Sequence, residues 1–222
     1  MLARELVVGL GLLGGVCSFQ AGRLVAWPTQ HQPRCHSFCG DTVDFLVSRF
    51  GSTEEVAKEV EGRLLPDIAT EMTHSRAAAL CDALQARLGL SEAQLQKVVV
   101  ALPAVLSLSF ESNLEPSLAK LQARLGLSEA QLQKVVVALP SVLGYSFESN
   151  LSPTLDFLQR ELALSLEALR ERVVRMPALL GYSLAKRYQP RLETCRVIGL
   201  APIIVIDRIT LSDVRFNASI GL

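Results

Sequence analysis

Basic side chains gather toward the C-terminal half of a 222-residue chain whose formal net charge is zero. Residues 160–199 carry eight Lys or Arg against four Asp or Glu. Lys and Arg bind phosphate groups, and each phosphate that they neutralise makes nucleic-acid binding more sensitive to salt. The candidate phosphate-binding residues are Arg170, Arg172, Arg175, Lys186, Arg187, Arg191 and Arg196.

Their spacing is that of helix surfaces. Arg172 and Arg175 are three residues apart and therefore share one side of a helix, and Arg191 follows Arg187 by about one turn. Charged side chains also solvate any exposed helix. Phosphate binding and ordinary solvation therefore both stay open for this set.

Two further bases recur at a fixed distance along the chain. Lys97 returns as Lys134, and Arg87 returns as Arg124. Equivalent charges in a row have the geometry that a phosphate backbone could follow. However, Arg87 and Arg124 lie near expected helix C-termini, where a positive charge also complements the helix dipole. We favour an ordinary surface role for these four.

Catalytic chemistry finds no support in the sequence. None of His31, His36 and His74 lies in the repeated segments beside a nucleophile or a carboxylate pair. There is no glycine-rich phosphate loop, and Cys35 and Cys39 with His36 lack the second pair of ligands that a zinc site needs. We expect no enzyme activity, cofactor, metal or small-molecule substrate.

Prolines that recur every 37 residues indicate the repeated structure that carries these charges. One series is Pro66, Pro103, Pro140 and Pro177, and a second is Pro116, Pro153 and Pro190. Residues 85–114 and 122–151 are identical at 27 of 30 positions. A fixed period of this length is typical of stacked helical units, which offer an extended concave surface for a partner.

One unit can be interpreted residue by residue. Ser128 and Gln131 form a capping-box pattern, and the following residues place apolar side chains on one helix face, at Leu132, Val135, Val136 and Leu139. Pro140 should end this first helix. We expect Asn150 to cap a second helix, with Pro153 in its first turn.

The period predicts the domain organisation. A degenerate unit is expected at about 50–87, and full units at about 88–124, 125–161 and 162–199, within a repeat domain of 41–199. Residues 200–222 have no partner at this spacing and are interpreted as an unmatched tail. Residues 1–40 resemble a targeting leader, with one acidic residue and an apolar run at 6–16. The leader is either an organellar presequence or a signal-like segment before a transit-like one, with a membrane anchor as the weaker third interpretation.

The units resemble those of the mitochondrial transcription termination factor (mTERF) family. The resemblance rests on the opening Leu88-Gly89-Leu90-Ser91 and its copy at 125–128. It also rests on the Pro-x-Leu-Leu type of turn at 103–106, 140–143 and 177–180, and on the later prolines. It implies an all-α solenoid superhelix, of either hand, in which each unit has two α-helices and a short 3₁₀ turn. It also implies import into mitochondria or plastids, with membrane contact only during import, and binding of double-stranded DNA or RNA.

Three functional hypotheses follow. The first is a nucleic-acid-binding regulator of organellar transcription, including its termination, or of RNA metabolism. The second is a protein-binding solenoid with organellar partners, because residues 41–75 are acidic and the chain is neutral overall. The third is a truncated copy without function. The tyrosines Tyr145, Tyr182 and Tyr188 are expected to pack between units, so stacking of single-stranded bases is not supported.

Overall fold

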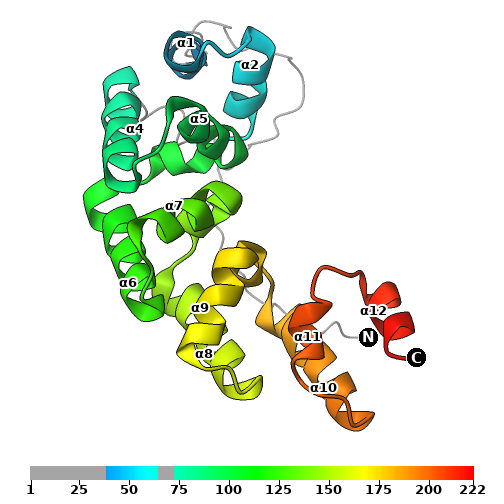
Figure 1. Cartoon of the computed structure of the whole chain (residues 1–222). Coiled ribbons are helices and arrows are strands. Elements are labelled where there is room, and N and C mark those ends of the chain that lie inside the picture. The colour runs from blue at the N-terminus through cyan, green and yellow to red at the C-terminus, as the bar shows by residue number, and fades with distance from the viewer. Residues whose placement is uncertain (1–38, 65–72) are drawn as a thin grey trace, which may run out of the picture. The chain divides into compact units, whose positions relative to one another are not determined.

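The computed structural model describes residues 39–64 and 73–222, and all of their secondary structure is helical (Figure 1). The predicted all-α fold of helical repeats is confirmed. Pro66 and most of the proposed leader lie outside the described residues. The α-helices before the third unit are α1 (Cys39–Phe50), α2 (Glu54–Gly62), α4 (His74–Leu88), α5 (Glu92–Ala101), α6 (Glu115–Leu125), α7 (Glu129–Ala138) and α8 (Ser152–Glu161). They are followed by α9 (Leu166–Arg175), α10 (Gln189–Val197), α11 (Ile204–Asp207) and α12 (Asp213–Ser219).

The first helix of each full unit ends at its proline, as predicted. Pro103, Pro140 and Pro177 each open a 3₁₀ turn directly after α5, α7 and α9. These turns are η1 (Pro103–Ser107), η3 (Pro140–Gly144) and η5 (Pro177–Leu180). The residue before each proline leaves the helical region, as proline demands of its neighbour, with φ near −134° at Leu139.

The second helix starts earlier than predicted, and the prediction that Asn150 caps it is wrong. A π-helical turn precedes each of α6, α8 and α10, namely η2 (Phe110–Leu114), η4 (Phe147–Leu151) and η6 (Leu184–Tyr188). The cap is Ser146, whose hydroxyl accepts from the Ser149 backbone N–H. Pro153 follows as the second residue of α8. A proline ring crowds the carbonyl four residues earlier, and a widened turn relieves that crowding.

The capping boxes and apolar stripes of the first helices are confirmed. Ser91 with Gln94, and Ser128 with Gln131, make both reciprocal hydrogen bonds. The stripe residues Leu132, Val135 and Val136 are fully buried. Together with the second-helix leucines they belong to a single cluster of buried side chains from Val43 to Phe216.

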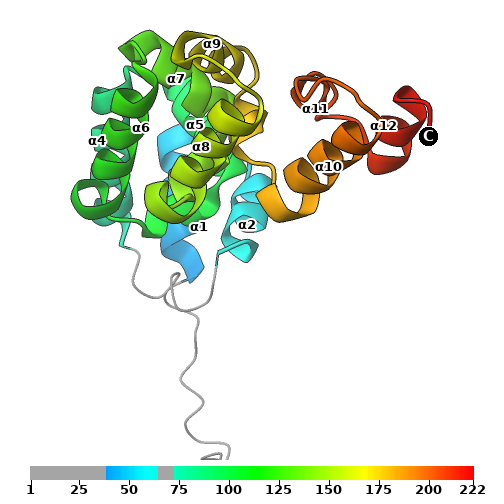
Figure 2. The ribbon, with the colours of Figure 1, turned by 90° about the horizontal axis from the view of Figure 1, so that it is seen from below.

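Successive units pack helix against helix. The first helices α5, α7 and α9 form a row in which each contacts the next (Figures 1 and 2). The second helices α4 and α6 also contact the first helix two units further on, α7 and α9 respectively. The row therefore places equivalent positions of neighbouring units side by side.

Left-handed residues connect one unit to the next. Gly89 and Gly126, with φ of 63° and 62°, end α4 and α6. Ala163 holds the same place after α8 with φ 52°, and Gly199 holds it after α10 with φ 73°. At Gly126 the N–H of the following Leu127 closes the turn by donating to the Gln122 carbonyl at 3.0 Å.

Residues 200–222 pack onto the third unit. Val205, Ile206, Ile209 and Phe216 are buried, and α11 contacts α10. Gly89, Gly126 and Ala163 each lie three residues before the start of a first helix, and α11 starts five residues after Gly199. Helix α11 therefore follows α10 at about the place of a further first helix.

Candidate nucleic-acid interface

Some of the predicted phosphate-binding residues have side-chain partners within the chain, and others have none. Arg191 has the most partners and is only 3% exposed. Its guanidinium donates to the backbone carbonyls of Arg208, Ile209 and Leu211, with Nη2 2.6 Å from the Leu211 oxygen. It also pairs with Asp213 at 2.7 Å. Arg191 therefore fastens the C-terminal segment and is not accessible to a phosphate group, contrary to the expectation from sequence.

Three other predicted bases have partners within the chain. Arg187 donates to the Ile209 carbonyl at 3.1 Å, and its guanidinium lies 5.0 Å from the centre of the Tyr182 ring. Arg172 pairs with Asp207 of α11 at 2.8 Å. Arg196 pairs with Glu161 at 2.6 Å. All three side chains hold elements together in the absence of a ligand.

Arg170 occupies a position that recurs in every unit. Its terminal nitrogen would lie 3.7 Å from a Cβ at Gly126. Gln133, its counterpart in the preceding unit, donates to the Gly89 carbonyl at 2.7 Å. Gln96 likewise donates to the Ser52 hydroxyl at 3.1 Å. The position thus lies against the end of the second helix two units earlier, which is α6 for Arg170 and α4 for Gln133. Arg170 makes only a 3.5 Å pair with Glu167.

Arg175 and Lys186 are the predicted residues whose side chains remain open. Both are exposed, and neither has an ion pair or side-chain hydrogen bond in the described part of the chain. Lys97 and Lys134 share this state. Lys97 and Lys134 stand at the same position of α5 and α7, and Arg175 lies one turn beyond that position on α9.

The recurring arginines Arg87 and Arg124 form ion pairs between units. Arg87 contacts Glu115 at 2.9 Å and Glu129 at 2.6 Å, and Arg124 contacts Asp156 at 2.8 Å. Partial burial lowers the pKa of Arg87, but its hydrogen bond to Glu129 and the nearby carboxylate charges outweigh burial and leave that pKa raised. Sequence reasoning assigned these residues only a surface role. A glutamine recurs 35 residues after each of these arginines, and Arg87 and Arg124 donate to these glutamines. This recurrence is the sequence signal that could have predicted the contacts between units.

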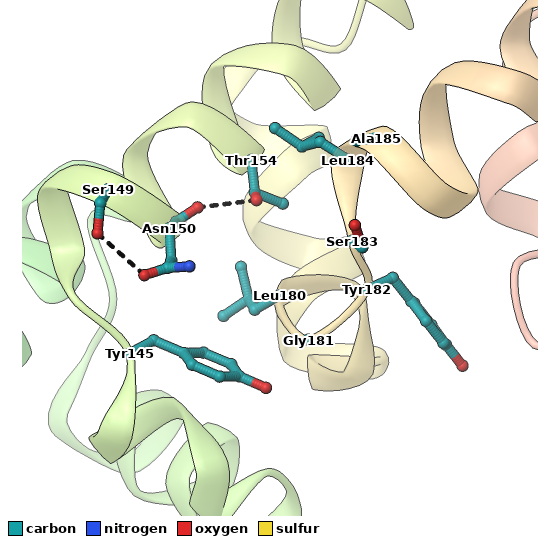
Figure 3. Close-up of a pocket in the computed structure, with 10 residues that line it drawn as sticks. All are labelled: Tyr145, Ser149, Asn150, Thr154, Leu180, Gly181, Tyr182, Ser183, Leu184 and Ala185. Carbon is teal, nitrogen blue, oxygen red and sulfur yellow. Dashed lines mark hydrogen bonds between the residues drawn. The ribbon is translucent and has the colours of Figure 1, made fainter. Parts of the chain in front are cut away.

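Two surface grooves repeat with the period of the sequence. One, of about 310 Å³, includes Ser112, Asn113 and Gly144 in its lining. The other, of about 400 Å³, has their counterparts Ser149, Asn150 and Gly181. Figure 3 shows the second groove, into which Tyr145 extends toward the Gly181 turn while Tyr182 points away.

The groove in Figure 3 is neutral. A Cβ at Gly181 would lie 3.4 Å from the Tyr145 hydroxyl, so glycine keeps this wall open. Thr154 donates to the Asn150 carbonyl at 2.8 Å, and Ser149 donates to the Asn150 side chain at 3.0 Å. No charged side chain is among its lining residues. The groove can hydrogen-bond an uncharged group and is unsuited to phosphate.

Tyr188 packs in the interior, as expected of the tyrosines. It is fully buried, and its hydroxyl donates to the Leu179 carbonyl at 2.8 Å. Burial raises the pKa of this hydroxyl well above its usual range. Tyr188 is therefore a structural side chain.

Comparison with known proteins agrees with the repeat geometry. The mTERF family model matches residues 42–217, which is most of the chain. The chain belongs to the mTERF family. The match continues through α11 and most of α12, beyond the last unit that the period defined.

Members of the mTERF family are nucleic-acid-binding helical-repeat proteins, typically of organelles. A sequence search of curated proteins found no match. Among the helices of residues 39–64 and 73–222, none is both long and apolar enough to cross a bilayer.

Proposed function

We propose that this mTERF protein binds double-stranded DNA or structured RNA in mitochondria or plastids, and thereby regulates organellar transcription or RNA metabolism. Family membership supports nucleic acid as the class of partner. The observation that carries the proposal is the set of open bases Lys97, Lys134 and Arg175 on the contacting helices α5, α7 and α9. Lys186 in the third unit adds a fourth open base.

The spacing of this row suits a phosphate backbone. Packed helices lie about 8–10 Å apart, and successive phosphates of one strand advance by about 3.4 Å along the duplex axis. The equivalent bases Lys97 and Lys134 would therefore lie about three phosphates apart, and Arg175, one turn further along α9, would extend the row. Such contacts hold a duplex in register without reading its sequence.

The test is duplex binding by the full chain and by two matched variants. Lys97→Glu combined with Lys134→Glu reverses two charges on the first-helix row. Arg160→Glu reverses an exposed base on the second helix α8. We expect the double variant to bind a labelled duplex more weakly and with a salt slope smaller by about two, whereas Arg160→Glu binds like the parent. Equal binding by all three proteins would refute the proposed row.

A protein-binding scaffold is the second candidate function. The neutral groove of Figure 3 favours it, because hydroxyl and amide groups suit a polypeptide better than a phosphate backbone. The scaffold would be supported if the chain captures an organellar protein and this capture does not weaken as the salt concentration rises. The chain would also have to bind no duplex and no structured RNA.

A further inference from the structure

A groove between α9 and α11 differs from the neutral groove of Figure 3. It has a volume of about 210 Å³, and Arg172, Arg175, Met176, Ile206 and Asp207 are among its lining residues. Two guanidinium groups therefore face one small surface hollow. Its volume exceeds several times the share of about 30 Å³ that a water molecule takes in the liquid, which leaves room for a phosphate group.

The two arginines are specific to the third unit. At the position of Arg172 the preceding units have Val98 and Val135, both fully buried. At the position of Arg175 they have Ala101 and Ala138. The repeat therefore does not need a charge at either place.

The short helix α11 leaves these positions open. Helices α5 and α7 are each followed by a first helix of 10 residues, whereas α9 is followed by α11, which has four. Helix α5 contacts α7, and α7 contacts α9, whereas the element that follows α9 is shorter. Room therefore remains beside α9 for charged side chains.

Asp207 fills part of this space. Its Oδ1 lies 2.8 Å from Nη1 of Arg172, and its side chain is 52% exposed. It is the last residue of α11, and the carbonyl end of a helix does not favour a carboxylate. The contact with Arg172 is therefore the evident reason for its placement.

We propose that this groove is a phosphate subsite, and that Asp207 occupies it in the free protein as an internal competitor. An incoming phosphate displaces the Asp207 carboxylate and takes both Arg172 and Arg175. Guanidinium groups make paired hydrogen bonds to phosphate oxygens. A half-exposed ion pair changes an equilibrium by about five-fold at most, so the carboxylate weakens phosphate binding without preventing it. If the phosphate is that of a nucleic-acid backbone, this inference rests on the proposed function.

The test compares Asp207→Asn with the parent chain on two probes, a labelled duplex and inorganic phosphate alone. Asp207→Asn keeps the shape of the side chain and removes its charge. We expect it to bind the duplex about 2- to 5-fold more tightly, with a salt slope steeper by about one. Asp207→Asn combined with Arg175→Ala should lose this gain. Thermal melting shows that each variant is folded.

Glu129→Gln is the matched control, because it removes a carboxylate from an ion pair with Arg87 away from the groove. It should leave both affinities unchanged. If Asp207→Asn binds neither probe more tightly while the parent binds the duplex, competition by Asp207 for the phosphate subsite is refuted and the proposed function stands. If only inorganic phosphate binds more tightly and no variant binds a duplex, the subsite serves a small phosphate compound and the proposed function fails.

Discussion

Replacement of Ala163 by glycine should stabilise the protein. Ala163 ends α8 with φ 52°, whereas glycine holds the corresponding place at Gly89, Gly126 and Gly199. A residue with a Cβ pays roughly 1–2 kcal/mol in this left-handed conformation. Glycine avoids this cost but makes the unfolded chain more flexible, which costs about 0.4–1 kcal/mol.

The net expectation for Ala163→Gly is a gain of about 0.5–1 kcal/mol in the free energy of unfolding. For a domain of this size that corresponds to a rise in Tm of about 1–4 °C. Calorimetry or circular dichroism on the full chain measures the shift, and urea unfolding gives the free energy independently.

Two glycine variants control for the backbone explanation. Gly126→Ala introduces the same strain at φ 62°, and its Cβ would meet only the Arg170 side chain at 3.7 Å, an ordinary contact. It should lose about 1 kcal/mol. Gly62→Ala, at a glycine without a positive φ and with nothing within 4 Å, should be neutral or mildly stabilising. A destabilised Ala163→Gly, or an unaffected Gly126→Ala, would refute the reasoning.

Three further predictions concern the core and the caps. Arg191→Ala should destabilise the chain by about 1–3 kcal/mol, because it removes a nearly buried guanidinium that bonds to the carbonyls of Arg208, Ile209 and Leu211 and leaves the Leu211 carbonyl without this donor. Urea unfolding measures this loss, and a change within about 0.5 kcal/mol would contradict it. Burial raises the pKa of the Cys81 thiol to about 12 from an ordinary 9.0. Between these two values only the unfolded thiol ionises, so the stability of the fold should decrease as the pH rises above about 9. Cys81→Ala should flatten this part of the plot of stability against pH, and an unchanged plot would exclude the thiol as its cause. Ser128→Ala removes the N-cap of α7 and should lower the free energy of unfolding by about 1 kcal/mol. The measurement is the decrease in Tm, with Ser112→Ala as the control. A decrease no larger than that of the control would contradict the role of the cap.

The periodic features of the fold were predictable from sequence because local chemistry alone decides them. Pro140 ends α7 by steric exclusion, and Ser128 with Gln131 caps it through hydrogen bonds within four residues. The π-helical turn before α8 was not predictable in this way. Both Ser146 and Asn150 are good caps, and the choice between them depends on how the chain accommodates Pro153 and packs Leu151.

The candidate site was less predictable because the state of a charged side chain depends on distant partners. Arg191 and Arg175 look alike in sequence, yet one is enclosed by carbonyls some 20 residues away and the other is open. The segment 200–222 has no partner at the period, so sequence gave no sign that Asp207 and Asp213 would meet Arg172 and Arg191.

The most direct test of the account is the salt dependence of duplex binding by the full chain. The open bases that we assign to the interface, Lys97, Lys134, Arg175 and Lys186, can neutralise up to about four phosphates, and each contributes about −0.9 to the slope of log K against log salt. We predict a slope between about −2 and −3.6, which is a loss of affinity of up to about 150-fold between 50 and 200 mM salt. Absence of duplex binding at low salt, or binding with a slope near zero, would contradict it.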